Sequence, residues 1–442
     1  MSMEYEEFER DEELLERRRL KRLEMKRRRK IQQRIIVGIL AVLLILVVVL
    51  IGKGCSKDPE PKQDEQIIEP PPVPEEPEVK EPDVKATLAA VGDIMMYNSQ
   101  IKAGLQEDQT YDFSSVFEAI IPYTISADLT VGNLELNMLG AAPYMGDART
   151  APYFNAPEIL ATNLSEIGFD ILQTGNTYSI MNGMTGLKST IDILNRNSID
   201  HVGTHATDPA ESASGGVVLR DVNGIKIAFI GFTKGVNSMT LPNNSKFAVD
   251  LLYTDYNTEF SQVDTTSILN RVDAAKNTGA DVVVAMLHWG SEYDLSISKT
   301  QEEIRDLMFR NGVDVILGSH SHVVGPMEML TVETAEGEEK ECFVAYSLGN
   351  FLSDMTRDYT MESVVLNLEF TKSGETGETT ITDVSYTPLY ILNRGEDADR
   401  QFEILPIRGA INSSLFEDYT DRMNAAIDNL KINTNSNYDS GK

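Results

Sequence analysis

Short apolar runs separated by amphipathic stretches make up the chain from about residue 85 to residue 317. Runs of roughly four to eight residues rich in Val, Ile and Leu predict buried strands, whereas apolar positions three and four residues apart predict helices. The predicted strands are Thr87–Val91, Ala127–Val131, Phe169–Thr174, Ile225–Ile230, Asp281–Leu287 and Val313–Leu317. The predicted helices are Pro157–Ile167, Gly186–Asn197, Thr265–Asn277 and Thr300–Asn311. This alternation predicts an α/β sandwich with a largely parallel sheet.

The pattern changes after residue 362, where alternating apolar and polar positions replace the helices. Ser363–Phe370 and Thr379–Tyr386 predict antiparallel strands, joined by a turn that contains two glycines. A last helix is predicted near Ser413–Leu430, before a polar tail. We therefore expect a folded domain over residues 85–410, followed by a C-terminal helix and tail over residues 411–442.

The chain begins with a basic segment followed by an uninterrupted apolar run, Ile35–Ile51. The run is long enough to span a bilayer as a helix, and the 34 residues before it contain twelve Lys and Arg. We expect a single-pass cell-membrane protein with residues 1–34 in the cytoplasm, residues 35–52 in the bilayer and the rest outside the cell. The alternative is a cleaved signal peptide, whose charged region is normally short. Residues 53–84, dense in Pro and Glu, predict an extended linker.

The formal net charge of −30 is distributed unevenly. Residues 1–34 carry twelve basic and nine acidic groups, so the remainder carries 27 basic and 60 acidic groups. A surface of this kind lacks the basic footprint that nucleic-acid binding requires, and we expect no nucleic-acid partner. Two cysteines exclude a disulfide framework, and Cys342, inside an apolar run, is expected to be a buried thiol.

Five side chains of metal-ligand type stand where predicted strands end. Asp93, Glu135 and His288 each follow an apolar run, and His320 and His322 follow a fourth run. Open α/β sheets bind ligands outside the carboxyl ends of their strands, so these side chains are expected to meet in one crevice. Carboxylates and imidazoles without thiolate suit Mn²⁺, Fe or Zn²⁺. The pattern predicts one or two divalent ions, with Glu135 able to bridge a pair.

The motifs resemble those of the bacterial capsule-synthesis CapA family, the poly-γ-glutamate biosynthesis accessory proteins. The resemblance rests on five ordered segments: Gly92–Asp93, Asn133–Glu135, His288–Tyr293, Gly318–His322 and Ser347–Phe351. It covers somewhat over half of the chain, from about residue 86 to residue 351. The family is similar to calcineurin-like metallophosphoesterases, so the resemblance implies a four-layer α/β/β/α sandwich. It also implies metal ligation by Asp93, Glu135, His288, His320 and His322, with His288 in a catalytic role as well.

One segment departs from the family pattern. The family usually has Asn-Asn-His followed by Asp three residues later, whereas this chain has Asn176, Thr177 and Tyr178, with Met181 at the Asp position. The resemblance assigns Asn176 to the metal, and Tyr178 takes the place of the histidine that helps to protonate the leaving group. A phenol with a reference pKa near 10 is a poor acid at neutral pH. The sequence therefore leaves open whether the protein is an enzyme. If it is active, we expect a metallophosphoesterase-like hydrolase.

Each candidate also has a simpler interpretation. A lone carboxylate after a strand is usually a turn former or a helix cap. Trp289, a candidate for substrate contact, also fits a packed aromatic cluster, and Asn350, a second candidate, also fits a residue that orients the loop. His201 and His205 are expected to be structural.

The resemblance implies that the chain helps to make, export or anchor a capsular polymer. The partners expected are that anionic polymer or its precursor, membrane polymer-synthase components and the lipid bilayer. A metal-dependent hydrolase of envelope substrates and a non-catalytic scaffold for a membrane synthase are the alternatives.

Overall fold

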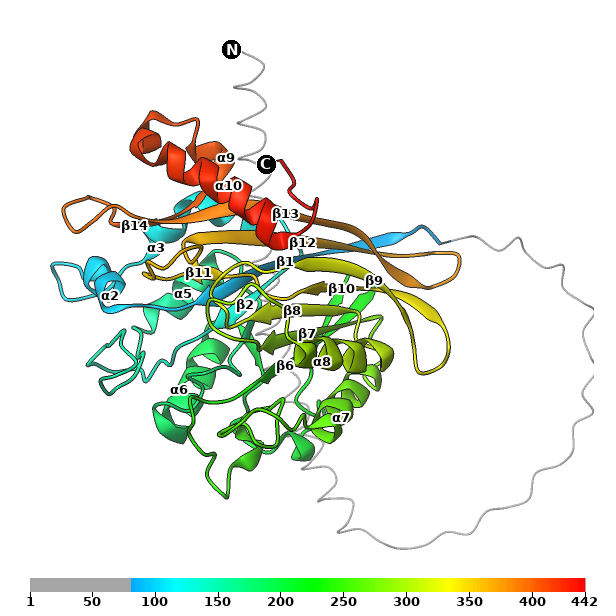
Figure 1. Cartoon of the computed structure of the whole chain (residues 1–442). Helices are drawn as coiled ribbons and strands as arrows, with labels where there is room; N and C mark the ends of the chain where they lie inside the picture. Colours follow the sequence, from blue (N-terminus) through cyan, green and yellow to red (C-terminus); the bar gives the residue numbers. More distant parts are fainter. Residues whose placement is uncertain (1–80, 442) are drawn as a thin grey trace, which may run out of the picture. The chain divides into compact units, whose positions relative to one another are not determined.

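The computed structural model describes residues 81–441 (Figure 1). The expected cytoplasmic segment, transmembrane helix and most of the linker lie outside these residues. Within residues 81–441, no helix combines the length and the apolar character needed to cross a membrane. Within these residues, 83–441 form one compact unit.

Two mixed β-sheets form the centre of this unit (Figure 1). The first sheet has eight strands, in the order β14 (Phe402–Pro406), β13 (Thr379–Asn393), β12 (Glu362–Lys372), β1 (Val84–Ile94), β2 (Leu129–Leu134), β3 (Ile171–Gln173) and β4 (Asp200–Val202), with β11 (Asn350–Leu352) beside β1. The second has six, in the order β5 (Val218–Val222), β6 (Ile225–Thr233), β7 (Val282–His288), β8 (Val315–Ser319), β10 (Glu339–Ala345) and β9 (Met327–Glu333). The strands β1 to β4 run parallel, as do β6, β7, β8 and β10, and the edge strands add antiparallel pairs.

Alternating side chains show that both faces of each sheet are covered. In β1, Leu88 belongs to the core between the sheets and Ala89 to the core outside the first sheet. In β7, Val284 belongs to the core between the sheets and Val283 to the core outside the second sheet. This is the period of two that a strand imposes on its side chains. Because both faces are buried, the strands are continuous apolar runs, as the sequence predicts.

Helices form the two outer layers. The first sheet is covered by α5 (Ile159–Glu166) and α6 (Gly183–Arg196), and the second by α7 (Thr265–Lys276) and α8 (Lys299–Arg310). Helix α8 begins where Ser298 and Gln301 form a capping box, and α7 begins at Asp264, whose carboxylate accepts from the N–H of Ser267. The result is a four-layer α/β/β/α sandwich, as the family resemblance implies.

The C-terminal residues pack into the same core. Helix α10 (Thr420–Thr434) contributes Met423, Ile427 and Leu430 to the core between the sheets, beside β13. The N–H of Tyr386 in β13 donates to the carbonyl of Tyr438 at 2.7 Å. Helix α10 therefore covers the part of the first sheet that extends beyond the second, and residues 411–441 are integral to the fold.

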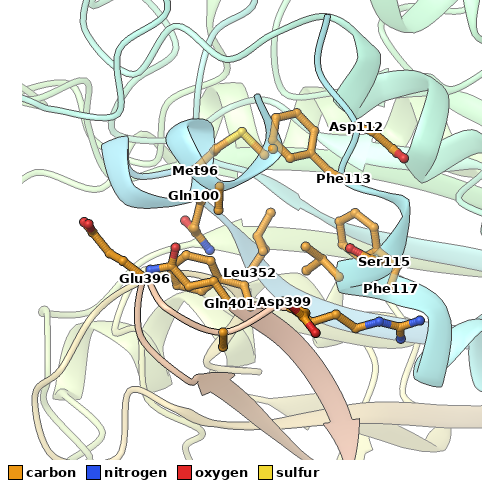
Figure 2. A pocket seen from close by; sticks show the side chains of 16 residues that line it. Met96, Gln100, Asp112, Phe113, Ser115, Phe117, Leu352, Glu396, Asp399 and Gln401 are labelled. Atoms are coloured by element: carbon orange, nitrogen blue, oxygen red, sulfur yellow. The ribbon is translucent and has the colours of Figure 1, made fainter. Parts of the chain in front are cut away.

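Three short helices precede β2 and cover one end of the first sheet: α2 (Asn98–Gly104), α3 (Ser114–Phe117) and α4 (Ile121–Ile125). A cavity of about 150 Å³ lies between α2, α3 and the loop before β14 (Figure 2). Phe113, Phe117 and Leu352 form its apolar wall, and Gln100 and Gln401 contribute amides. None of the predicted site residues lines this cavity, so it is separate from the candidate site.

Candidate metal centre

The five predicted ligands meet where strands of the two sheets end. Asp93 lies near the end of β1 and Glu135 follows β2, whereas His288 is the last residue of β7 and His320 and His322 follow β8. All five are buried; the most exposed is His320, at 7%. The first sheet therefore supplies the carboxylates and the second the imidazoles, as expected for side chains at the carboxyl ends of parallel strands.

Their ligand atoms form two groups that share one carboxylate. Glu135, His288 and His320 offer atoms that all lie within 4.8 Å of one another, and so do Asp93, Glu135 and His322. Two ions about 3.5–4 Å apart need a ligand of this kind between them. Glu135 is therefore positioned to bridge two ions, which is the role that the sequence allows it.

The donor atoms fit a divalent cation. The Oε2 atom of Glu135 and the Nδ1 atom of His320 are buried and have no hydrogen-bond partner within residues 81–441. Buried polar groups are nearly always satisfied, so two unsatisfied atoms in one cluster need an explanation. Coordination by a cation supplies one, because carboxylate and imidazole together suit Mn²⁺, Fe or Zn²⁺.

Close backbone approach fixes β1 against the segment before β11 at the centre. A Cβ atom at Gly92 would lie 1.9 Å from the carbonyl oxygen of Gly349, so only glycine allows β1 to meet the segment before β11 there. The N–H of Asp93 donates to that carbonyl at 2.8 Å. His320 and His322 have φ of 94° and 60°, a left-handed region uncommon for residues other than glycine. Such strain is typical of functional sites.

Neutral polar side chains orient the ligands. The Nδ2 group of Asn133 donates to Asp93 Oδ1 at 2.7 Å, and the hydroxyl of Ser319 lies 3.1 Å from His288 Nδ1. Partners of this kind fix the orientation of metal ligands. The sequence alone predicts no role for either residue, although Asn133 lies in one of the five segments that resemble the family and Ser319 directly precedes His320.

The electrostatics of the centre follow from burial and from ion pairing. His322 Nδ1 lies 3.0 Å from Asp93 Oδ2. Burial alone would lower the pKa of His322, but its hydrogen bond to Asp93 and the charges of Glu135 and Asp93 raise that pKa to about 9. Burial would raise the pKa of Asp93, but the hydrogen bond and the charge of His322 outweigh burial and lower that pKa.

His320 differs from His322. Its burial and the nearby charges of His288 and Lys234 lower the pKa of His320 well below the ordinary value, which keeps its imidazole neutral. Metal ligation requires neutral imidazole. His320 is therefore in the ligand form before any ion binds.

The loop that departs from the family pattern lies against the centre. The Nδ2 group of Asn176 donates to Asn133 Oδ1 at 3.2 Å and to the carbonyl of Leu134 at 2.7 Å, and its Oδ1 accepts from the N–H of Tyr178 at 3.2 Å. The Thr177 hydroxyl lies 2.9 Å from His288 Nε2. Asn176 is thus hydrogen-bonded to Asn133, which itself contacts Asp93. Ligation of a metal by Asn176 stays a prediction.

Tyr178 packs against Phe154, with ring centroids 4.6 Å apart. Burial, followed by the negative charge of Glu135, raises the pKa of the Tyr178 phenol far above its ordinary value. The hydroxyl therefore keeps its proton at neutral pH, and it can donate a hydrogen bond more readily than it can release the proton. Burial, followed by the charges of Tyr293 and Glu135, also raises the pKa of Tyr97, whose ring lies 5.5 Å from that of Phe154.

Trp289 and Asn350, the two predicted substrate contacts, are both buried. Trp289 is 1% exposed, stacks on Tyr346 with centroids 5.8 Å apart, and donates from Nε1 to the carbonyl of Tyr346 at 2.9 Å. Asn350 is 0% exposed, and its Oδ1 lies 3.1 Å from His322 Nδ1. Trp289 therefore belongs to the core and Asn350 orients His322, and contact of either residue with a substrate stays a prediction.

The two remaining histidines lie outside the five-residue cluster. His205 Nε2 lies 2.8 Å from Asp250 Oδ2, and the Arg271 guanidinium donates to Asp250 Oδ1 at 2.6 Å. Burial lowers the pKa of His201 to about 4, so His201 is neutral. These contacts agree with a structural role for both residues.

Comparison with known proteins is informative over the region that carries the centre. The family model described as bacterial capsule synthesis protein PGA_cap matches residues 87–355. The chain is 28% identical over 304 residues to the capsule biosynthesis protein CapA of Bacillus anthracis, which covers 68% of this chain and 66% of that protein. It is 26% identical over 296 residues to the PGA biosynthesis protein CapA of Bacillus subtilis strain 168, covering 66% of this chain and 70% of the relative.

Among solved structures, a candidate 5′-nucleotidase from Staphylococcus aureus in complex with alpha-ketoglutarate aligns with a TM-score of 0.43 and 14% identity, over 78% of this chain and 58% of that one. Likeness at this level says nothing about activity. The family model, in contrast, spans more than half of the chain and includes all five ligand-type residues. The chain therefore belongs to the family of bacterial capsule synthesis proteins.

Proposed function

We propose that this protein acts in the synthesis, export or anchoring of an anionic capsular polymer, and that a divalent-metal centre at Asp93, Glu135, His288, His320 and His322 holds an acidic group of that polymer. The observation that carries the proposal is the pair of buried ligand groups that share Glu135. Family membership supports the capsule-related role. We also propose that the metal centre takes part in this role and that the polymer is poly-γ-glutamate.

A bound divalent ion would supply positive charge that attracts a carboxylate or phosphate group and activates water. The chain's own residues would then position that group. Asp93 and Glu135 hold the centre from the first sheet, and the three imidazoles hold it from the second. The Tyr178 phenol, which keeps its proton, can donate a hydrogen bond to an oxygen of the bound group.

We further propose that residues 35–52 anchor the protein in the cell membrane and that its folded domain works outside the cell, with membrane polymer-synthase components as partners. The apolar run Ile35–Ile51 and the basic segment before it support this topology. The acidic remainder of the chain gives no support to a nucleic-acid partner.

The test is complementation in cells whose own copy of the gene has been deleted. Surface polymer is measured with the wild-type chain, with the His320→Ala/His322→Ala double variant and with His201→Ala as the matched histidine control. We expect wild type and His201→Ala to restore the polymer and the double variant to fail while reaching the same protein level. Full restoration by the double variant would show that the centre has no part in the function.

A metal-dependent hydrolase is the second candidate, because a carboxylate shared by two ligand groups is the arrangement of two-metal hydrolases. Turnover of a phosphate ester that requires added Mn²⁺ and disappears in Asp93→Asn would favour it. Wild-type capsule formation without any such turnover would favour a binding or scaffold role. Gain of turnover on changing Thr177 to Asn and Tyr178 to His would show that this loop has lost a catalytic function.

A further inference from the structure

A second cavity contains a buried carboxylate that the metal centre does not use. Its volume is about 380 Å³, and it lies between the loop before β12, strand β13 and helix α10. Glu362, the first residue of β12, lines it and is 7% exposed. Its Oε1 accepts from Asn429 Nδ2 at 2.6 Å, whereas its buried Oε2 has no hydrogen-bond partner within residues 81–441.

Glu362 lines the cavity and carries a buried carboxylate oxygen without a partner, which makes this residue a candidate acceptor for a ligand's hydrogen-bond donor. Leaving a buried acceptor unsatisfied is costly, and the cost is larger for a charged group. Burial raises the pKa of Glu362 to about 7; the hydrogen bond from Asn429 opposes this shift, and the negative charge of Asp358 adds to it. An ammonium group is the donor that would offset this cost best, because it also supplies the opposite charge.

Two arginines line the same cavity, Arg357 and Arg422. The Arg357 guanidinium stacks on the Tyr293 ring, 4.1 Å from its centroid, and Arg422 has no ion-pair partner in the described part of the chain. An arginine without a partner is suited to a carboxylate. The cavity therefore combines an anionic acceptor for an ammonium with a cationic donor for a carboxylate.

The loop that forms one wall is held in an unusual conformation. Tyr359 lines the cavity, is 40% exposed, and has φ of 66°, which is strained for a bulky residue. Hydrogen bonds from the N–H of Thr360 to the carbonyl of Arg357, and from that of Glu362 to the carbonyl of Tyr359, fix the turn. Large exposed aromatic rings attract ammonium groups through their faces. Strain of this kind is typical of ligand-binding loops.

We propose that this cavity binds an α-amino-acid head group, with the ammonium at Glu362 and the carboxylate at Arg422. Tyr293 connects this cavity to the metal centre. Its ring stacks with the Arg357 guanidinium of the cavity, and its centroid lies 5.9 Å from that of the His322 ring. The site thus takes a zwitterionic end, while the metal centre takes an acidic group.

The source of this head group is either a free amino acid or the amino end of a chain. A γ-linked glutamate chain keeps the α-ammonium and the α-carboxylate on the same carbon at its amino end, whereas an α-linked chain does not. The assignment of the head group to the end of a γ-linked polymer rests on the proposed function. The preference of the cavity for an α-amino-acid head group does not depend on that function.

The experiment is calorimetric binding to the purified full-length chain. The probes are glutamic acid, 4-aminobutyric acid (which lacks the α-carboxylate), and a short γ-linked glutamate oligomer with a free or an N-acetylated amino end. We expect the free-ended oligomer to bind roughly tenfold or more tightly than the acetylated one, and glutamic acid more tightly than 4-aminobutyric acid. Binding of the oligomer alone would identify a chain end, and equal binding of glutamic acid would identify a free amino acid as sufficient.

Three variants assign the preference to the cavity. Glu362→Gln keeps the acceptor for Asn429 and should abolish the preference for a free amino end. Arg422→Gln, at an exposed position, should abolish the preference for the α-carboxylate. Glu369→Gln, on the same strand but paired with Lys85 at 2.6 Å, is the matched control and should behave as wild type.

Equal binding of free and acetylated oligomers to wild type, or a preference that survives in Glu362→Gln, would overturn the proposal. Each measurement is repeated after removal of metal with a chelator, and we expect the preference for the head group to persist. Metal content is measured separately for every variant. Absence of metal from the wild-type protein would count against the proposed centre alone, and loss of the head-group preference would count against this cavity alone.

Discussion

The substitution Gly92→Ala tests whether close approach of the two backbones positions Asp93. A Cβ at residue 92 would lie 1.9 Å from the carbonyl oxygen of Gly349, 2.7 Å from its carbonyl carbon and 2.8 Å from the oxygen of Leu348. All three are backbone atoms, and contacts below 3.0 Å essentially never occur. Strand β1 and the segment before β11 must therefore move apart by about 1 Å, since no side chain can rotate away.

The energetic cost follows from this separation. Overpacking of a well-packed core costs about 1–3 kcal/mol, and rigid backbone neighbours favour the upper end of that range. Separation also weakens the 2.8 Å hydrogen bond from the N–H of Asp93 to Gly349, at about 1 kcal/mol. We expect the free energy of unfolding to fall by about 3–4 kcal/mol. Because metal ligands tolerate shifts of only about 0.2 Å, metal affinity should fall by at least about tenfold.

Urea unfolding monitored by tryptophan fluorescence measures the stability term, because Trp289 is the single tryptophan and is buried. Metal affinity is measured by competition with a chromophoric chelator. Gly409→Ala is the control, since a Cβ at that position would meet no atom within 4 Å. A Gly92→Ala protein within about 0.5 kcal/mol of wild type, with unchanged metal affinity, would refute the argument from close approach.

Three further predictions concern stability, reactivity and metal affinity. The folded-state pKa of Glu362 is raised from 4.5 to about 7, so the free energy of unfolding of wild type should fall as pH rises from about 4.5 to 7. At pH 8, Glu362→Gln should be more stable than wild type by about 2 kcal/mol. Urea unfolding at pH 4.5 and pH 8 checks this, and the same pH dependence of stability in both proteins would contradict it. Burial raises the pKa of the Cys342 thiol to about 12. In a Cys55→Ser background, this thiol should therefore react with a thiol reagent only as fast as the protein unfolds. Rapid labelling of the folded protein would contradict this prediction. Asn133→Ala, which removes a hydrogen bond to Asp93, should weaken metal binding about 10–100-fold; a chelator competition that gives the wild-type affinity would show that Asn133 does not orient its neighbour.

Much of the fold is predictable from the sequence because its strands are buried on both faces. The predicted strand Asp281–Leu287 corresponds to β7, and the predicted helix Thr265–Asn277 corresponds to α7. Both have strong local signals, a continuous apolar run and a helical period. The edge strands β5 and β9 have no such signal, since much of their surface is only partly buried. They pair through contacts that only the assembled sheet provides.

The ligand-type residues of the centre are predictable for a related reason. The carboxyl ends of parallel strands meet at one edge, so a charged residue that ends an apolar run has a predictable place. Sequence position does not reveal which way a neighbour faces. Trp289 directly follows His288 but points into the opposite core, and Asn350 lies under His322.

Sites that join distant segments are the hardest to predict. The second cavity combines Glu362 with Arg422 and Asn429 of α10, a helix that the sequence predicts but places outside the folded domain of residues 85–410. No local pattern connects these residues. Packing of α10 on the first sheet brings them together, and only the folded structure shows it.

The metal content of the full-length chain tests the central claim most directly. Wild type is loaded with Mn²⁺ or Zn²⁺, freed of loose ions and measured by mass spectrometry beside Glu135→Gln and the control Glu369→Gln. Because Glu135 belongs to both ligand groups, we predict about two ions per chain in wild type and in the control, and fewer than about one in Glu135→Gln. Wild-type protein without bound metal, or a Glu135→Gln variant that keeps the full complement, would contradict the account.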